Sequence, residues 1–255
     1  MGERSAKIIA VAGKGGVGKT SLSAAMLRCL TERYPDKRIL AIDADPAVGL
    51  STALGLTVGE TLDGIRRRVS EEVAARQGGA VGDILAGVSA SLRGAMLHPA
   101  GYDFFAIGRP ETAGCYCAVN TYLRQVIGTL VGEYDYAVID SEAGIEQINR
   151  RVLERVTHLV LVSDGSKKGV DVIGTVRRVA DELVMYERCG AVLNRVPDTA
   201  AARRVDLGGL PLLAVIGEDD AQTEFDILGR TVFDLPDTAP VLTGARTALA
   251  ALDII

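Results

Sequence analysis

The sequence predicts an α/β fold in which a doubly wound, mostly parallel sheet of seven to eight strands is flanked by helices. Three observations predict this class. Short apolar runs alternate with helical patterns along most of the chain. The runs are almost continuously apolar, as expected where helices cover both faces of a parallel sheet. A glycine-rich segment, "GKGGVGKTS" (13–21), follows the first run and precedes a helical pattern.

Seven runs rich in β-formers are expected to be the strands, and they lie at 7–13, 38–45, 103–109, 135–141, 158–164, 190–196 and 211–217. The helices between them are amphipathic, as the apolar spacing at 172, 176, 179 and 183 illustrates. The stretch from about 57 to 100 contains no strand pattern. We expect it to be a helical insertion between the second and third strands of one domain that spans 1–255.

The composition is typical of a globular protein, with 48% hydrophobic and 24% charged residues. No apolar run reaches the roughly 20 residues that span a bilayer, and no secretion signal precedes the first strand. We therefore expect a cytoplasmic protein with reduced thiols. The net charge of -5 weighs against unaided binding to nucleic acid or to an anionic membrane.

The segment 13–21 matches the pattern G-x-x-x-x-G-K-[ST] in the strand–loop–helix context that a phosphate-binding loop requires. Its glycines let successive backbone N–H groups point at phosphate oxygens, and the helix N-terminus adds its positive end. Lys19 should bridge the β- and γ-phosphates, and the Thr20 hydroxyl should ligate Mg²⁺. The expected nucleotide contacts in this loop are Gly13, Lys14, Gly15, Gly16, Val17, Gly18, Lys19, Thr20 and Ser21.

Acidic residues follow two of the predicted strands. Asp43 and Asp45 end the second strand, and Asp140 ends the fourth. Any one of them could simply cap the next helix. Because parallel strands end at one edge of a sheet, their convergence on a phosphate loop favours a site for Mg²⁺ and a nucleotide, with Asp43 and Asp140 holding the metal directly or through water.

The additional lysine of "KGGVGKT", Lys14, resembles the signature lysine of the dimeric NTPases that include nitrogenase iron protein, MinD, ParA and the arsenite-pump ATPases. The resemblance implies that Lys14 reaches the nucleotide of a partner copy, so that hydrolysis of ATP to ADP depends on a homodimer. It also implies that Asp45 orients the attacking water beside the catalytic Lys14 and Lys19, and that residues 140–144 sense the γ-phosphate. The base contacts implied are Asn194, Arg195, Glu218 and Asp219.

Cys115 and Cys117 in "GCYC" are the least ordinary pair in the chain. On an extended segment, residues two apart point the same way, so both thiolates could face one metal. Thiolates suit Zn²⁺ and Ni²⁺, but two ligands do not fill a four-coordinate site. A two-fold axis would supply the second pair. The alternative is that both cysteines are passive loop residues.

The segments "GRPETAGCYCAVN" (108–120), "DSEAGIEQINRR" (140–151) and "VSDGSKKGV" (162–170) resemble the CooC family of nickel-insertion ATPases. The resemblance implies an ATP-dependent metallochaperone that binds Ni²⁺ or Zn²⁺ across a nucleotide-linked homodimer. Its client would be carbon monoxide dehydrogenase or acetyl-CoA synthase. Gln147 stands where that resemblance leads us to expect a histidine, which puts any histidine-dependent role in doubt.

Two other functions stay open at this point. An ATP-dependent electron donor with a bridging iron–sulfur cluster would need separated cysteines rather than an adjacent pair. A positioning ATPase of the ParA or MinD type would need a basic surface or a basic amphipathic tail, whereas the C-terminal "TGARTALAALDII" has one arginine.

Overall fold

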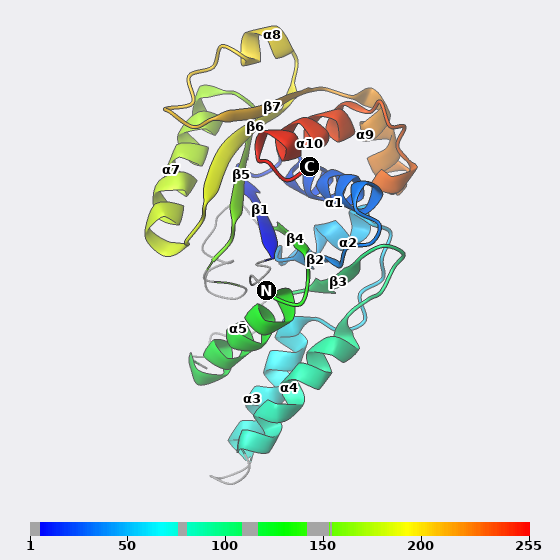
Figure 1. Cartoon of the computed structure of the whole chain (residues 1–255), viewed down its shortest axis with the longest axis vertical. Coiled ribbons are helices and arrows are strands. Elements are labelled where there is room, and N and C mark those ends of the chain that lie inside the picture. The colour runs from blue at the N-terminus through cyan, green and yellow to red at the C-terminus, as the bar shows by residue number, and fades with distance from the viewer. Residues whose placement is uncertain (1–5, 76–80, 109–116, 142–152, 154) are drawn as a thin grey trace.

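The computed structural model describes residues 6–75, 81–108, 117–141, 153 and 155–255, without the side chains of 73–75, 81–86, 117–120 and 226. Its core is one sheet of seven strands in the order β3-β2-β4-β1-β5-β6-β7, and every neighbouring pair is parallel (Figure 1). The predicted fold class and all seven predicted strands are confirmed. The strands are β1 Lys7–Gly13, β2 Ile39–Asp43, β3 Asp103–Ala106, β4 Tyr136–Asp140, β5 His158–Ser163, β6 Arg188–Val196 and β7 Leu212–Gly217.

Helices cover both faces of the sheet, as the apolar strands require. Because side chains alternate along a strand, Ile9 and Val11 join one core while Ala10 and Ala12 join the other. The first core is closed by α1 (Lys19–Arg33), α2 (Gly49–Ala53) and α10 (Pro240–Ala251). The second is closed by α5 (Cys117–Val131) and α7 (Lys167–Leu183), together with the insertion. Shorter connections are α8 (Thr199–Ala202), α9 (Asp220–Ile227) and η1 (Val232–Asp234).

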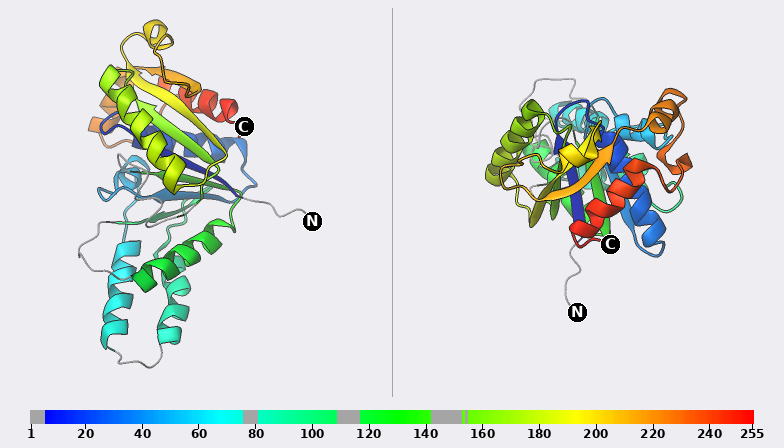
Figure 2. Two further views of the ribbon diagram at one scale, coloured as in Figure 1. Left: turned by 90° about the vertical axis from the view of Figure 1, so that its left-hand side faces the viewer. Right: turned by 90° about the horizontal axis from the view of Figure 1, so that it is seen from above.

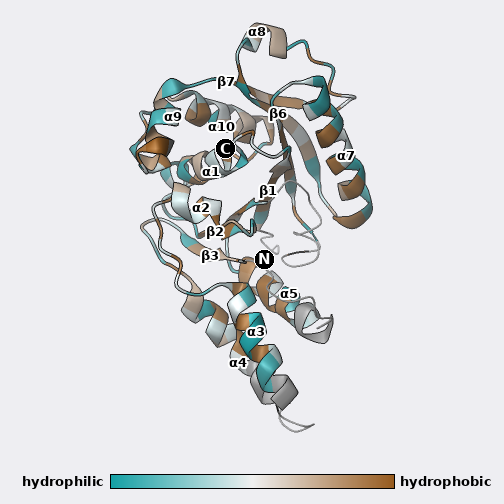
Figure 3. Ribbon diagram, turned by 180° about the vertical axis from the view of Figure 1, so that it is seen from behind, coloured by the Kyte–Doolittle hydropathy of each residue, from teal (hydrophilic) through white to brown (hydrophobic). Residues whose placement is uncertain are grey.

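The insertion between β2 and β3 is helical, as predicted. It consists of α3 (Leu62–Ala75) and α4 (Val81–Ala95), which lie side by side and project away from the sheet next to α5 (Figure 2). Ile65, Val69, Val88 and Leu92 anchor the pair in the second core. The visible side of α3 is largely hydrophilic (Figure 3), so the charged residues of this segment serve its solvent-exposed surface. No helix among the described residues combines the length and apolarity needed to cross a membrane.

The strand register brings the predicted site residues to one edge of the sheet. Asp43 on β2 lies opposite Asp140 on β4, and Asp140 lies opposite Val11 on β1. At the end of β1, Gly13 has φ 135°, and a Cβ there would lie 2.2 Å from the carbonyl oxygen of Val162 on β5. Only glycine allows the chain to leave the sheet here and begin the phosphate loop.

Arg28 of α1 ties the chain between β7 and α10 to the body of the fold. Its side chain is buried, and Nη1 donates to the carbonyl oxygens of Val232 and Leu235 at 3.1 and 2.7 Å. The same guanidinium lies 2.6 Å from carboxylate oxygens of both Glu32 and Asp237. A buried charge is tolerated because every side of it meets an acceptor.

We predict that Arg28→Ala lowers the free energy of unfolding by about 3 kcal/mol, because two backbone carbonyls and the carboxylates lose their donor. Urea denaturation followed by circular dichroism measures the change. Arg33→Ala is the matched control, since Arg33 lies exposed on the same helix; it should change the value by less than about 0.5 kcal/mol. Equal effects of the two substitutions would contradict the anchoring role.

Candidate nucleotide site

The loop after β1 has the backbone of a phosphate-binding loop. Gly16 and Gly18 have φ 76° and 82°, and a Cβ placed on Gly15 or Gly16 would meet nothing within 4 Å. Gly18 is the N-cap of α1 and has no side chain with which to cap it. The first N–H groups of the helix therefore face a loop with open space beside it, which fits phosphate oxygens.

Lys19, the first residue of α1, folds back over this loop. Its side chain is buried, and Nζ donates to the carbonyl oxygen of Lys14 at 3.0 Å. The ammonium is thus held at the mouth of the loop, at the place predicted for contact with the β- and γ-phosphates.

Asp140 lies next to the first turn of α1. Thr20 Oγ1 donates to its Oδ2 and Ser23 Oγ donates to its Oδ1, both at 2.8 Å. Burial raises the pKa of the Asp140 carboxyl to about 6, although the two hydroxyl donors and Lys19 work against the rise. The Thr20 hydroxyl and the carboxylate supply the oxygen ligands that Mg²⁺ prefers, so the residues fit this metal.

Asp43 is also fully buried, but its oxygens face the backbone of the next loop. Oδ2 accepts from the N–H groups of Leu50 and Ser51 at 2.9 and 3.2 Å, and Oδ1 accepts from that of Asp45 at 3.2 Å. Burial and the neighbouring charge of Asp140 raise the pKa of the Asp43 carboxyl to about 7. Asp43 therefore shapes the loop 43–51, and its role as a metal ligand stays a prediction.

Asp45, the predicted water-orienting residue, begins a tight turn in this loop. Its Oδ1 accepts from the N–H of Ala47 at 2.8 Å, and Val48 follows in the left-handed region with φ 54° and ψ 45°. That conformation costs a β-branched residue on the order of 1–3 kcal/mol. The loop therefore holds strain next to the site.

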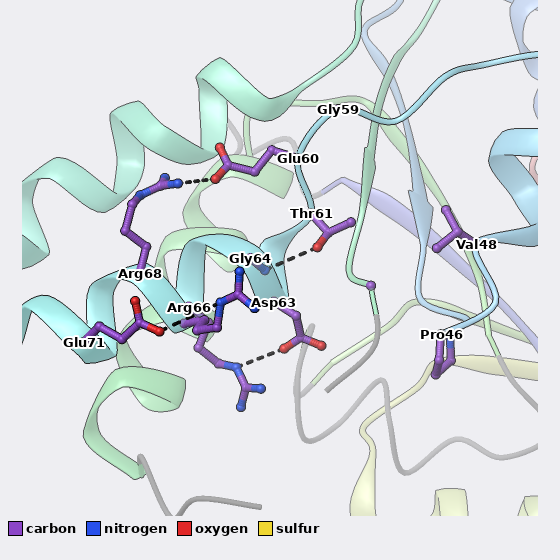
Figure 4. Close-up of a pocket in the computed structure, with 12 residues that line it drawn as sticks. Pro46, Val48, Gly59, Glu60, Thr61, Asp63, Gly64, Arg66, Arg68 and Glu71 are labelled. Atoms are coloured by element: carbon purple, nitrogen blue, oxygen red, sulfur yellow. Dashed lines mark hydrogen bonds and ion pairs between the residues drawn. The ribbon is translucent and has the colours of Figure 1, made fainter. Parts of the chain in front are cut away.

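Pro46 and Val48 also form one wall of a pocket of about 650 Å³ whose other wall is the start of α3 (Figure 4). Ion pairs line it, with Arg66 Nε 2.9 Å from Asp63 Oδ1 and with Arg68 paired to Glu60. The loop of Asp45 thus faces the insertion across this pocket, an arrangement that nothing in the sequence pattern predicts.

The Lys14 side chain points to the loop that follows β5, whereas the Lys19 side chain folds over the phosphate loop. Its N–H donates to the carbonyl oxygen of Val162 at 3.1 Å, and its ammonium forms an ion pair with Asp164, which follows β5. Burial opposes ionisation of Asp164, but hydrogen bonds from Lys14 and Ser166 outweigh it and lower the pKa of this carboxyl to about 2. No pattern in the sequence indicates Asp164 as the partner of Lys14.

Two of the residues predicted to contact the base, Asn194 and Arg195, lie next to the phosphate loop. Asn194 is buried, and its Nδ2 donates to the carbonyl oxygen of Val17 at 2.8 Å. Arg195 has φ 55°, and its Nε would lie 3.1 Å from a Cβ on Gly18. The N–H of Glu218 donates to the carbonyl oxygen of Val196 at 3.2 Å, which fixes the loop after β7 beside the end of β6.

Asp219 has a local hydrogen bond of its own. Its Oδ1 accepts from the N–H of Ala221 at 3.0 Å, at the start of α9. This contact is that of a helix cap, so a base contact by Asp219 stays a prediction.

The predicted thiolate pair is described only in part. Cys115 and the switch residues 142–144 lie outside the described residues, and Cys117 is the first residue of α5, with an undescribed side chain. The backbone at Cys117 is therefore helical rather than extended. The other cysteines are structural: burial raises the pKa of Cys29 to about 11 and that of Cys189 to about 12. Among the described side chains, no three His, Cys, Asp or Glu residues group as a metal site.

Comparison with known proteins agrees with this geometry. The family model described as the CobQ/CobB/MinD/ParA nucleotide binding domain matches residues 8–232. An uncharacterised ATP-binding protein of Methanocaldococcus jannaschii is 32% identical over 238 residues, which cover 92% of this chain and 93% of that protein. The carbon monoxide dehydrogenase accessory protein CooC of Rhodospirillum rubrum is 28% identical over 251 residues, 89% of this chain and 83% of its own.

Solved structures share the fold along almost the whole chain. The septum site-determining protein MinD of Pyrococcus horikoshii, complexed with Mg-ADP, has a TM-score of 0.67 at 24% identity and covers 97% of this chain and 96% of its own. A ParA family ATPase of Chlorobium tepidum has a TM-score of 0.66 at 19% identity and covers 97% and 98%. At these identities the likeness establishes the fold.

The buried carboxylate predicts a pH-dependent stability. The pKa of the Asp140 carboxyl is about 6 in the folded protein and ordinarily 3.8. Between pH 3.8 and pH 6 the folded state therefore binds a proton at this carboxyl more tightly than the unfolded state does. The free energy of unfolding therefore falls as pH rises through that window. We expect Asp140→Asn to raise the stability of the nucleotide-free protein at pH 8 by on the order of 1–3 kcal/mol, with no gain at pH 4.

Urea denaturation in EDTA at both pH values measures this effect. Asp164→Asn is the matched control of opposite sign. Its carboxyl has a lowered pKa and stabilises the fold above its ordinary value of 3.8, so loss of its charge should reduce stability at pH 8. A variant with Asn at 140 that is less stable than wild type at pH 8 would contradict the account.

Proposed function

We propose, because the chain belongs to the CobQ/CobB/MinD/ParA nucleotide-binding family, that it hydrolyses ATP to ADP and phosphate in a cycle that joins and separates two copies of the chain. ATP binding follows from the family and from the loop at 13–21. The finer proposal is that the cycle controls the binding and release of a metal ion for a nickel enzyme.

The ion pair between Lys14 and Asp164 carries the first part of the proposal. A phosphate loop needs one lysine, and Lys19 already lies at its mouth. While Lys14 is held by Asp164, its ammonium is committed to the neighbouring loop. Because the Lys14 ammonium points away from the phosphate loop of its own chain, it is suited to contact a phosphate group bound to another copy. There it would neutralise the charge that develops during phosphoryl transfer.

The chain's own residues have distinct roles in this reaction. Lys19 and the loop N–H groups hold the phosphates, and Asp45 is the candidate to orient the attacking water. Thr20 and Asp140 would hold Mg²⁺, with Asp43 nearby, and the metal supplies charge neutralisation on the β- and γ-phosphates. Asn194 and Arg195 would hold the adenine against the loop.

We expect Lys14→Ala to bind ATP within about threefold of wild-type affinity while losing a factor of 10³ or so in turnover, the size of effect that a finger residue supplied by a partner has. A phosphate-release assay and a fluorescent-nucleotide titration separate the two quantities. Lys167→Ala is the matched control, because Lys167, the first residue of α7, is exposed and forms only a surface ion pair with Asp171 one turn further along the helix. Unchanged turnover in Lys14→Ala would rule out the role in a partner copy.

Cys115 and Cys117 support the metal part of the proposal together with the similarity to the CooC accessory protein. Thiolate ligands suit Ni²⁺ and Zn²⁺, and a two-fold axis would complete a site of four thiolates. In this proposal the dimer that Lys14 needs for hydrolysis also builds the metal site. The client enzyme would be carbon monoxide dehydrogenase or acetyl-CoA synthase.

The double substitution Cys115→Ala/Cys117→Ala should abolish tight Ni²⁺ binding and leave ATP affinity unchanged, because the thiolates lie outside the phosphate loop. Calorimetry with Ni²⁺, and separately with Zn²⁺, measures the loss. Cys189→Ala is the control for removing a thiol of raised pKa. Equal Ni²⁺ affinity in the double variant would refute the site, and absorbance near 400 nm in the purified protein would favour the iron–sulfur alternative.

A positioning ATPase is the second candidate, and the observation that favours it is the fold likeness to MinD and ParA structures. The net charge of -5 weighs against it. Co-sedimentation with DNA and with acidic phospholipid vesicles in the presence of ATP tests this function independently of metal binding.

A further inference from the structure

Ser23 is a buried polar residue on the face of α1 that packs against the sheet. Its exposed fraction is 0%, and so are those of its neighbours Leu22 and Ala24. The hydroxyl donates to Asp140 Oδ1 at 2.8 Å, one helical turn beyond Thr20, which donates to Oδ2 of the same carboxylate at 2.8 Å. No motif in the sequence includes Ser23.

The helix itself gives no reason for a serine at this position. A serine inside a helix commonly donates to the carbonyl oxygen four residues before it, which satisfies the hydroxyl locally. Here the hydroxyl donates across to β4 instead. Alanine has the higher helix propensity and would suit the apolar surroundings better. What the serine provides is therefore a donor to the carboxylate.

Two donors fix the plane of the carboxylate more firmly than one. Thr20 alone would leave Asp140 free to rotate about its last bond and to exchange its two oxygens. With Ser23 holding Oδ1, Oδ2 is the oxygen that stays on the side of Thr20, at the start of α1. Asp140 is also buried, so no water is at hand to replace a missing donor.

We propose that Ser23 is a positioning residue for Mg²⁺: it acts through Asp140 and sets the orientation of the carboxylate in which Oδ2 and the Thr20 hydroxyl face the metal together. The inference rests on the proposed Mg²⁺ site at Thr20 and Asp140. It predicts that loss of the Ser23 hydroxyl lowers the contribution of Mg²⁺ to nucleotide affinity. The affinity that the phosphate loop provides without Mg²⁺ should be unchanged.

The test compares the dissociation constant of ADP in EDTA with that in excess MgCl₂, by calorimetry on the full-length protein. The dissociation constant in EDTA divided by that in MgCl₂ gives the factor by which Mg²⁺ strengthens ADP binding. In Ser23→Ala the ratio should fall about tenfold, the value of one hydrogen bond to a charged group, while the constant in EDTA stays within about twofold of wild type. An unchanged ratio would overturn the proposal.

A double-mutant cycle with Asp140→Asn asks whether Ser23 acts through Asp140. If it does, Ser23→Ala changes the ratio in wild type and has no further effect in the Asp140→Asn background. Equal effects in both backgrounds would show that Ser23 supports the fold in general and would overturn the positioning role. Thr157→Val is the matched control, since Thr157 is a buried hydroxyl bonded to Ile8 at the opposite end of β1; its ratio should equal that of wild type.

The outcomes separate the two levels of the proposal. If Mg²⁺ adds nothing to ADP affinity in wild type, the Mg²⁺ site itself fails and the role of Ser23 fails with it. If Mg²⁺ strengthens ADP binding equally in wild type and Ser23→Ala, the site stands and the role of Ser23 is refuted. Should Ser23→Ala prove unfolded by circular dichroism, Ser23→Cys replaces it, because cysteine has a similar volume and a weaker donor. A lower ratio in Ser23→Cys would then support the role of Ser23, and an unchanged ratio would refute it.

Discussion

The carboxylate of Asp140 lies at the end of the inner strand β4 with no exposed surface, and both of its oxygens accept hydrogen bonds from hydroxyl groups of α1. Burying a carboxylate is unfavourable unless donors surround it, so the start of α1 and the end of β4 must stay in register. That requirement also fixes the phosphate loop, because the loop joins β1, the neighbour of β4, to α1. The contact that holds the phosphate loop in place is therefore also the contact on which the proposed Mg²⁺ site depends.

Around this contact the molecule places two neighbouring carboxylates and an ion-paired lysine. Asp43 and Asp140 are adjacent across β2 and β4, and burial raises the pKa of both. Lys14 is balanced, but by Asp164 on a neighbouring loop rather than by a phosphate. In the function proposed here, Mg²⁺ would offset the charge of the two carboxylates, and the nucleotide of a partner copy would compete with Asp164 for Lys14. The two events would therefore favour a different arrangement of the same loops.

The loop 43–51 connects these charges to the rest of the surface. Asp43 holds its far end through Leu50 and Ser51, Val48 is strained, and Pro46 contributes to the pocket beside α3. The carbonyl oxygen of Asp43 also accepts from the N–H of Ile107 at 2.8 Å, whose own carbonyl accepts from the N–H of Asp63 at 2.9 Å. The helical insertion is thus tied by hydrogen bonds to the strand that carries Asp43.

The sequence by itself determined the seven strands, the helical insertion and the phosphate loop, because apolar runs and glycine spacing are local properties read directly along the chain. It also indicated Thr20 and Asp140, since parallel strands end at one edge. It did not indicate Ser23, Asp164 or the pocket that Val48 shares with the insertion. Each of these depends on segments far apart in the chain, as Ser23 and Asp140 are. Only the packed tertiary structure decides which buried polar group meets which donor, because that pairing minimises the cost of burying charge and leaves no periodic trace in the sequence.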